Sequence, residues 1–255
     1  MHPRATVDRA RHLSQQGLTD RVVAQSVGVS IGAVQKWRTG IRRAPGTERK
    51  SGCPRCDGQS LDEPAYSYLL GLYLGDGCIS VGGDRAKAVW KLSIFCDDAW
   101  PGLFHECAQA MRTVRPDNKV SRVQRQGCSE VKSYSRHWPC LFPQHGPGKK
   151  HMRKIDLAVW QQVIVERHPG EFARGLLHSD GYRGVNRVRR RWADRDHWYE
   201  YPRYLFVNES EDILRICGQT LDRLGVEWRF SKPNTISVAK RDAVTRLDEF
   251  VGPKY

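Results

Sequence analysis

Two short segments of the chain carry the residues best suited to chemistry. Residues 69–77 and residues 173–181 are largely apolar, hold small residues four positions apart and end in Asp-Gly. A repeat of this kind predicts a duplicated architecture in which the two copies occupy equivalent places. The repeated acids, Asp76 and Asp180, therefore predict a site built from two equivalent carboxylates.

The small residues in these segments predict how the two acids meet. Gly71 and Gly75 lie one turn apart on one face of a helix, and Gly175 and Ser179 hold the matching positions in the second copy. Small residues at this spacing let two helix backbones approach closely. If the two helices cross at these positions, their C-terminal ends converge and bring the two aspartates side by side.

Paired carboxylates at such a place need cations. They would repel each other and lie in the negative potential of two helix C-termini. Mg²⁺ is the natural candidate, because it is a hard ion satisfied by a few carboxylates, waters and phosphate oxygens. Divalent ions held between two acids and a phosphodiester support in-line hydrolysis, since they activate water and stabilise the leaving oxygen. The acids therefore predict phosphodiester hydrolysis with Mg²⁺.

Both segments resemble the paired motif of the LAGLIDADG homing endonucleases. Residues 69–77 read Leu-Leu-Gly-Leu-Tyr-Leu-Gly-Asp-Gly, and residues 173–181 read Ala-Arg-Gly-Leu-Leu-His-Ser-Asp-Gly. The sequence departs from the motif at Leu74 and His178, where many members of the family have Asp. Both terminal aspartates are kept.

The resemblance implies an α+β fold over residues 62–252. Its two halves, about 62–144 and 168–252, would each have an α-β-β-α-β-β-α order and be related by a pseudo-two-fold axis. The motif helices would pack at this axis, and Asp76 and Asp180 would bind two or three Mg²⁺ ions and act as the catalytic residues. A chain with both motifs is expected to act as a monomer that cleaves a long, nearly asymmetric site in double-stranded DNA.

The resemblance also implies assisting basic residues, because one often lies near each metal site in this family. By its position just after the last expected strand, Lys240 is the candidate in the second half. Lys132 or Arg136 is the candidate in the first half.

The bulk composition fits a nucleic-acid partner. The net charge of +14 and the isoelectric point of about 9.6 predict affinity for a polyanion, nucleic acid first. The chain has no signal-peptide pattern, and no apolar run approaches the roughly 20 residues of a membrane span. We therefore expect reduced thiols and a cytoplasmic protein without a membrane partner, nucleoid-associated if the source is bacterial.

The first part of the chain follows a helix-turn-helix pattern and is predicted to be a small all-α domain over residues 1–44. Gly28 allows a left-handed turn between the second and third helices, and Ser30 caps the third helix. The residues that this helix offers to a major groove are Gln35, Lys36 and Arg38.

Residues 45–61 are predicted to be a basic linker, which contains Cys53 and Cys56 separated by two residues. The pair resembles one knuckle of a zinc ribbon. Zinc usually takes four ligands, and no second cysteine pair lies nearby, although His2 or His12 could complete a set. The sequence therefore favours a structural turn over a zinc site.

Apolar periodicity predicts the elements that follow each motif. The expected elements are hairpins over 78–95 and 119–135, helices over 98–112 and 136–142, a connection over 145–156, strands over 181–192 and 198–207, a helix over 212–224, strands over 226–231 and 235–238, and a helix over 243–250.

Basic side chains on these strands predict a DNA-binding surface. Residues 181–192 form the most basic strand, in which Arg183, Arg187, Arg189 and Arg191 share one face at a period of two. Such a strand needs an anionic partner, and arginines on a β-ribbon in the major groove pair with guanine or hold phosphates. The strand residues predicted to contact DNA are Lys87, Lys91, Arg183, Arg187, Arg189, Arg191 and Arg229.

Two other functions stay open. A non-catalytic transcriptional regulator that reuses the LAGLIDADG fold would also suit a helix-turn-helix domain. An RNA partner, as for an intron-assisting maturase, would suit the basic surface. The retained Asp76 and Asp180 favour the enzyme, because a pure binder gains little from paired acids.

Overall fold

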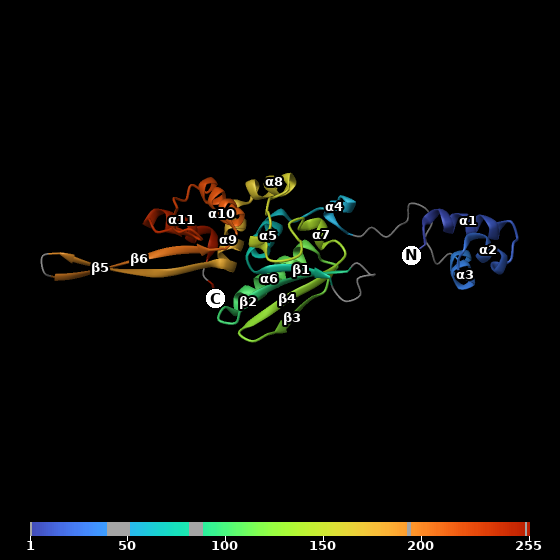
Figure 1. The fold of residues 1–255 in the computed structure, drawn as a ribbon, viewed down its shortest axis with the longest axis horizontal. Coiled ribbons are helices and arrows are strands. Elements are labelled where there is room, and N and C mark those ends of the chain that lie inside the picture. Colours follow the sequence, from blue (N-terminus) through green and yellow to red (C-terminus); the bar gives the residue numbers. More distant parts are fainter. Residues whose placement is uncertain (1, 40–51, 82–88, 193–194, 253) are drawn as a thin grey trace. The chain divides into compact units, whose positions relative to one another are not determined.

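The chain forms two compact units, Met1–Ser51 and Gly52–Tyr255. The computed structural model describes residues 2–39, 52–81, 89–192, 195–252 and 254–255, which Figure 1 shows as ribbon. Lys87, which was predicted to contact DNA, lies outside the described residues.

The first unit is a bundle of three short helices, α1 (Arg4–Gln15), α2 (Asp20–Val27) and α3 (Ile31–Arg38). The predicted turn between α2 and α3 is present, since Gly28 ends α2 in the left-handed region with a φ of 68°. The Ser30 side chain accepts a hydrogen bond from the backbone N–H of Ala33, as expected of an N-cap. The bundle core consists of Val7, Ala10, Val23, Ala24, Val34 and Trp37.

The second unit is α+β and has two four-stranded antiparallel sheets. Its first half comprises α5 (Glu63–Asp76), β1 (Gly77–Val81), β2 (Trp90–Asp97), α6 (Pro101–Val114), β3 (Val120–Gln124), β4 (Cys128–Ser135) and α7 (Trp138–Leu141). Its second half comprises α9 (Pro169–Asp180), β5 (Gly181–Trp192), β6 (Arg195–Val207), α10 (Glu211–Arg223), β7 (Arg229–Lys232), β8 (Thr235–Val238) and α11 (Arg241–Val251). The strand orders, β1-β2-β4-β3 and β5-β6-β8-β7, are equivalent.

The described residues also contain three elements outside this order. They are α4 (Pro54–Asp57), the 3₁₀ helix η2 (Lys150–Met152) and α8 (Val159–Arg167). The sequence analysis missed α8, which lies between the two halves. Gln161 anchors this helix, because its amide donates to the hydroxyl of Tyr66 on α5 at 2.7 Å.

The two halves share one hydrophobic core. Helix α5 is buried along its length from Tyr66 to Leu74, and it packs directly on α9. The same cluster continues through Leu92 on β2, Phe206 on β6 and Leu247 on α11. The second unit is therefore a single domain in which the two motif helices are central. In the part of the chain that is described, no helix is both long and apolar enough to cross a membrane.

Several element boundaries differ from the sequence expectation, and the starts of β7 and β6 each differ by three residues. The strand expected from Val226 begins at Arg229, because Gly225 and Val226 close α10. Gly225 takes a φ of 64°, and the Val226 N–H donates to the Leu221 carbonyl at 2.9 Å. Strand β6 begins at Arg195, three residues before the expected strand. The long ribbon that it forms with β5 extends beyond the helices in Figure 1.

Candidate functional site

The crossing of α5 and α9 leaves no room for side chains at two glycines. A Cβ on Gly71 would lie 2.6 Å from the Phe172 carbonyl oxygen and 2.7 Å from the Leu176 nitrogen. A Cβ on Gly175 would lie 3.0 Å from the Gly71 Cα and would clash with the carbonyl oxygen of Tyr68. These backbone contacts place both glycines where α5 and α9 cross, and the crossing fixes where both helices end.

The C-terminal ends of the two helices converge at the predicted acids. A Cβ on Gly75 would lie 3.0 Å from Asp180 Oδ2 and would clash with Ser179, so the second helix ends against the first. Asp76 and Asp180 are the last residues of α5 and α9, and both are half-buried. The Asn208 amide donates to Asp180 Oδ2 at 2.6 Å and orients that carboxylate.

Two lysines cap the same helix ends. The Lys150 ammonium donates to the carbonyl oxygens of Tyr73, Leu74 and Gly75 at 2.5, 2.9 and 2.6 Å. The Lys254 ammonium donates to the carbonyl oxygens of Ser179 and Gly181, at the end of α9. Each lysine thus satisfies carbonyls that a helix terminus leaves open and adds positive charge where the helix dipole is negative.

These lysines are equivalent in the repeat. Lys150 follows Asp76, and Lys254 follows Asp180, by the same number of residues. Each comes just after the last helix of its half, α7 or α11. The sequence analysis missed both lysines, although their matched spacing from the repeated acids was a usable signal.

Burial makes both acids harder to ionise than they are in water. Burial and the neighbouring Asp180 carboxylate raise the pKa of Asp76 to about 6, against the opposing effect of Lys150 and Lys254. Burial also raises the pKa of Asp180, although its hydrogen bond from Asn208 acts in the opposite direction. Burial lowers the pKa of Lys150 to about 8. Two half-buried carboxylates side by side are an all-oxygen donor set that fits a hard divalent cation.

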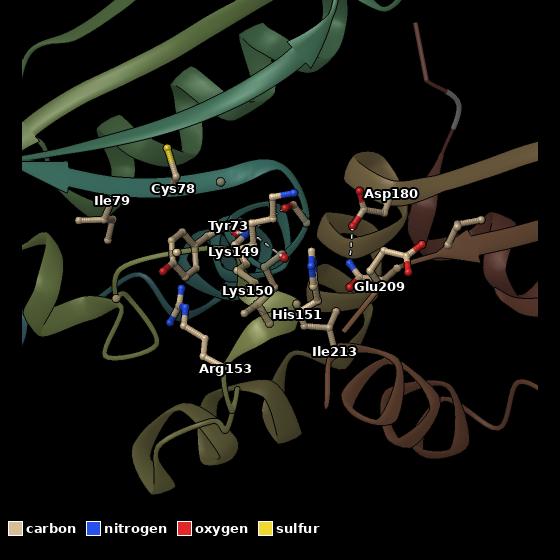
Figure 2. Close-up of a pocket in the computed structure, with 17 residues that line it drawn as sticks. Tyr73, Cys78, Ile79, Lys149, Lys150, His151, Arg153, Asp180, Glu209 and Ile213 are labelled. Carbon is tan, nitrogen blue, oxygen red and sulfur yellow. Dashed lines mark hydrogen bonds between the residues drawn. The ribbon is translucent and has the colours of Figure 1, made fainter. Parts of the chain in front are cut away.

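Cavities open on both sides of the acid pair. One, of about 430 Å³, is lined by Lys150 and Asp180 among others. In Figure 2 the basic side chains from Lys149 to Arg153 line one side of it, and Asp180 and Glu209 line the other. A second cavity is lined by Asp76 and Lys254. Each cavity therefore combines one aspartate with the lysine that caps the opposite helix.

The raised pKa of Asp76 predicts a pH-dependent stability. In the folded chain the pKa of Asp76 is about 6, above its ordinary value of 3.8. The contribution of this carboxyl to the free energy of unfolding is therefore full below pH 3.8 and is lost as the pH rises through 6. The loss is on the order of 2–3 kcal/mol in the metal-free chain. We expect Asp76→Asn to be more stable than the parent chain at pH 7 in urea unfolding with EDTA, and about equally stable at pH 4.

His178, the histidine of the second motif, also makes the stability depend on pH. The effect of Asp76 must therefore be measured as a difference between the parent chain and Asp76→Asn. Burial lowers the pKa of His178 to about 4, so its contribution is lost as pH falls, opposite to that of Asp76. Its ring contacts the Tyr68 hydroxyl at 3.0 Å and the Val251 carbonyl oxygen at 2.8 Å. His178 thus ties α9 to α5 and α11. Subtracting the variant's pH profile from that of the parent isolates Asp76, and an unchanged difference across pH would contradict the prediction.

Lys240 does not lie with the acids in this arrangement. Its ammonium pairs with Glu227 at 2.6 Å, and both side chains are exposed. The lysines that act on the pKa of Asp76 are Lys150 and Lys254. Position after the last strand was therefore a poor guide, because that place becomes the N-cap of α11.

The arginines of β5 have acidic partners within the chain. The ion pairs are Arg183–Asp248 at 2.7 Å, Arg187–Glu200 at 3.1 Å and Arg189–Asp196 at 2.5 Å. Arg191 lies on the same ribbon, opposite Asp196. The paired arginines therefore do not require an outside anion, because acids on β6 and α11 already pair with them.

The register of the second sheet separates two faces. Arg183 pairs with Tyr204, which is buried beneath α11. By alternation, Arg187, Arg189 and Arg191 therefore belong to the same face, which the helices cover at the ribbon's base. The opposite face carries Arg203, which donates to the Ser237 hydroxyl at 2.8 Å, and Arg229, which pairs with Ser237 in register. Arg203 is a basic residue of the solvent face that the sequence analysis missed.

The remaining predicted DNA contacts lie on both units. Lys91 pairs with buried Glu130 at 2.9 Å. Although burial would raise the pKa of Glu130, hydrogen bonds from Arg125, Lys91 and Ser93 hold it at about 2. On the first unit, Gln35 and Lys36 are exposed on α3, whereas Arg38 pairs with Asp20 of α2 at 3.1 Å.

The two cysteines of the expected linker belong to the second unit. Cys53 precedes α4, Cys56 lies within it, and both lie against His137 and Cys140 at α7. His2 and His12, either of which was suggested from the sequence as a further zinc ligand, belong to the other unit.

Solved structures have the same fold. I-DmoI in complex with DNA and Mn matches 76% of this chain and 99% of its own, at 15% identity and a TM-score of 0.50. The LAGLIDADG meganuclease I-AabMI, bound to uncleaved DNA, matches 72% of this chain and 82% of its own, at 10% identity and a TM-score of 0.44. The N-terminal LAGLIDADG domain of DUF199/WhiA matches 75% of this chain and 83% of its own, at 13% identity and a TM-score of 0.44.

No family model and no curated protein matches the chain by sequence. At these identities the likeness establishes the fold alone. The α+β fold of the second unit is that of the LAGLIDADG homing endonucleases, as the two motifs predicted.

Proposed function

We propose that the chain is a site-specific endonuclease that hydrolyses phosphodiester bonds in double-stranded DNA with Mg²⁺. The observation that carries this proposal is the meeting of Asp76 and Asp180 at two convergent helix ends, where burial and the Asp180 carboxylate raise the pKa of Asp76. I-DmoI, whose fold is similar, was solved with DNA and Mn.

Asp76 and Asp180 would hold the metal ions. Bound there, two or three divalent ions would supply an activated water and stabilisation of the leaving oxygen. The chain's own residues do the positioning. Asn208 holds the Asp180 carboxylate, and Lys150 and Lys254 offset the negative helix ends so that both acids stay ionised at neutral pH.

One chain would be sufficient for cleavage of both strands. Residues 62–252 would form two related halves, each of which contributes one carboxylate, and the segment that follows each half contributes one lysine. The enzyme is therefore proposed to act as a monomer, with DNA on the solvent faces of the two sheets. Its substrate would place it in the cytoplasm, with the nucleoid in a bacterium.

The proposed DNA surface differs in detail from the one expected from sequence. Arg203 and Arg229 lie on the solvent face of the second sheet and would contact DNA directly. Farther along the ribbon, Arg187, Arg189 and Arg191 would reach phosphates while keeping or exchanging their acidic partners. Lys91 would act from the first sheet.

A bound-site selection tests the proposal. Duplexes that bind the full chain are selected from a random library in Ca²⁺, and Mg²⁺ is then added to the recovered sequence. We expect cleavage of both strands at one position. Tight and specific binding without cleavage in Mg²⁺ or Mn²⁺ would support the alternative, a non-catalytic transcriptional regulator, which the three-helix first unit favours.

The first unit is proposed to be a helix-turn-helix domain over residues 1–44 that lengthens the recognised site. We expect the double substitution of Gln35→Ala and Lys36→Ala to weaken binding of the selected duplex roughly 10- to 100-fold, because both side chains are exposed on α3. Fluorescence anisotropy at fixed salt measures the affinity. Arg9→Ala, which removes one exposed charge from α1, is the control. An equal loss of affinity in this variant would indicate that net charge, and not contacts of α3, determines the effect.

A further inference from the structure

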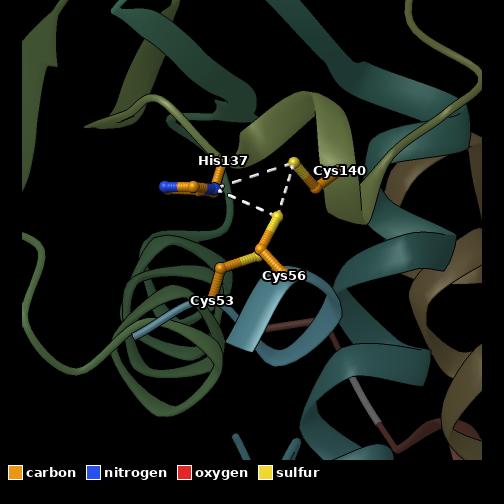
Figure 3. Close-up of side chains that lie close together, drawn as sticks. All are labelled: Cys53, Cys56, His137 and Cys140. Carbon is orange, nitrogen blue, oxygen red and sulfur yellow. Dashed lines mark hydrogen bonds between the residues drawn. The ribbon is translucent and has the colours of Figure 1, made fainter. Parts of the chain in front are cut away.

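Four metal-binding side chains meet at the start of the second unit, away from the paired aspartates. Cys53 and Cys56 come from the ends of α4, and His137 and Cys140 come from the turn into α7. Their four ligand atoms all lie within 4.8 Å of one another. Figure 3 shows the imidazole and the thiols of Cys56 and Cys140 directed toward a common point.

The distances match the edges of a zinc tetrahedron. The Cys56 and Cys140 sulfurs are 3.6 Å apart, and His137 Nδ1 lies 3.5 Å from Cys56 Sγ and 3.7 Å from Cys140 Sγ. Zn–S bonds of about 2.3 Å and a Zn–N bond of about 2.0 Å give tetrahedral edges of roughly 3.8 Å between sulfurs and 3.6 Å between sulfur and nitrogen.

Contacts other than the cluster hold both segments in place. Asp57 accepts a hydrogen bond from the Cys53 N–H at 3.2 Å. The Arg55 guanidinium lies 4.6 Å above the Trp160 ring of α8. On the other side, the indole of buried Trp138 donates to the Ser133 carbonyl at 3.0 Å. The fold therefore brings the two ligand pairs together, although the pairs lie far apart in sequence.

We propose that Cys53, Cys56, His137 and Cys140 bind one structural zinc ion. The set is complete with four protein ligands, which is typical of structural rather than catalytic zinc sites. The two cysteine-containing segments would be fastened to each other at the point where the chain enters the second unit. Helix α7 in turn accepts a hydrogen bond at Leu141 from Tyr66 of α5. The zinc site is independent of the proposed nuclease activity.

Zinc content of the full chain, purified from zinc-supplemented cultures, tests the proposal. We expect about one zinc ion per chain by mass spectrometry of the metal, and less than about a tenth of that in Cys56→Ser and Cys140→Ser. Cys128→Ser, a partly buried cysteine of β4 outside the cluster, should keep the ion. Zinc-free parent protein, or full zinc in Cys56→Ser, would overturn the proposal.

A conservative exchange separates ligation from folding. His137→Cys keeps four ligands and is expected to retain zinc, whereas His137→Ala is expected to lose most of it. Replacement by Co²⁺ should give the absorption bands of a tetrahedral thiolate site in the parent chain. A Cys56–Cys140 disulfide in protein isolated with its thiols blocked, in place of bound metal, would also refute the assignment.

Discussion

Gly175→Ala is expected to destabilise the second unit by about 3 kcal/mol, a large loss for the addition of one methyl group. Helix propensity alone would favour alanine over glycine. Here the new Cβ would lie 3.0 Å from the Gly71 Cα and against the Tyr68 carbonyl oxygen. Both contacts are backbone atoms of α5, so the helices must move apart, and the acid pair must separate with them.

Urea unfolding of the full chain measures this effect. Gly146→Ala is the matched control, because its Cβ would meet only the side chain of Arg153, at 3.2 Å. The control should lie within about 1 kcal/mol of the parent. If both variants were equally stable, the close crossing of α5 and α9 would not determine the stability of this unit.

Asp76→Asn and Asp180→Asn are each expected to lower cleavage of the selected duplex by roughly 10³-fold or more, because either change removes a charged ligand from the metal site. Binding of the same duplex in Ca²⁺ should fall far less, since the basic sheet faces are unchanged. Metal-free Asp76→Asn should also be more stable at pH 7, as the raised pKa of Asp76 requires. Cleavage rates, affinity and urea unfolding separate the three effects.

Asp156→Asn is the matched control for the charge change. Asp156 is exposed and pairs with Lys154 and Arg215, so its loss should leave cleavage unchanged. Cleavage by Asp76→Asn at the parent rate would show that this carboxylate holds no catalytic metal. Loss of DNA binding together with cleavage would instead point to a structural role.

The central part of the site was predictable because its signals are local. Asp76, Asp180 and the small residues before them lie within two short segments, and a helical spacing is sufficient to bring them to one crossing. The succession of strands and helices along the chain followed from apolar periodicity in the same way. The turn at Gly28 was equally local, since a single glycine in the left-handed region ends α2.

The missed residues depend on contacts between distant segments. Lys150 and Lys254 lie beyond the regular elements of each half, so only the repeat spacing could indicate them. His137 and Cys140 reach Cys56 across most of the first half. The face occupied by the β5 arginines was not predictable from alternation alone, because alternation separates two faces without saying which one the helices cover.

The proposed metal site offers the most direct test. A crystal structure of the full chain with its selected DNA and Mn²⁺, examined by anomalous scattering, would locate the ions. We predict manganese peaks between the carboxylates of Asp76 and Asp180, next to the phosphates that are cut, and no such peaks in the double variant with asparagine at both positions. Manganese absent from this place in a complex that cleaves its DNA would contradict the account.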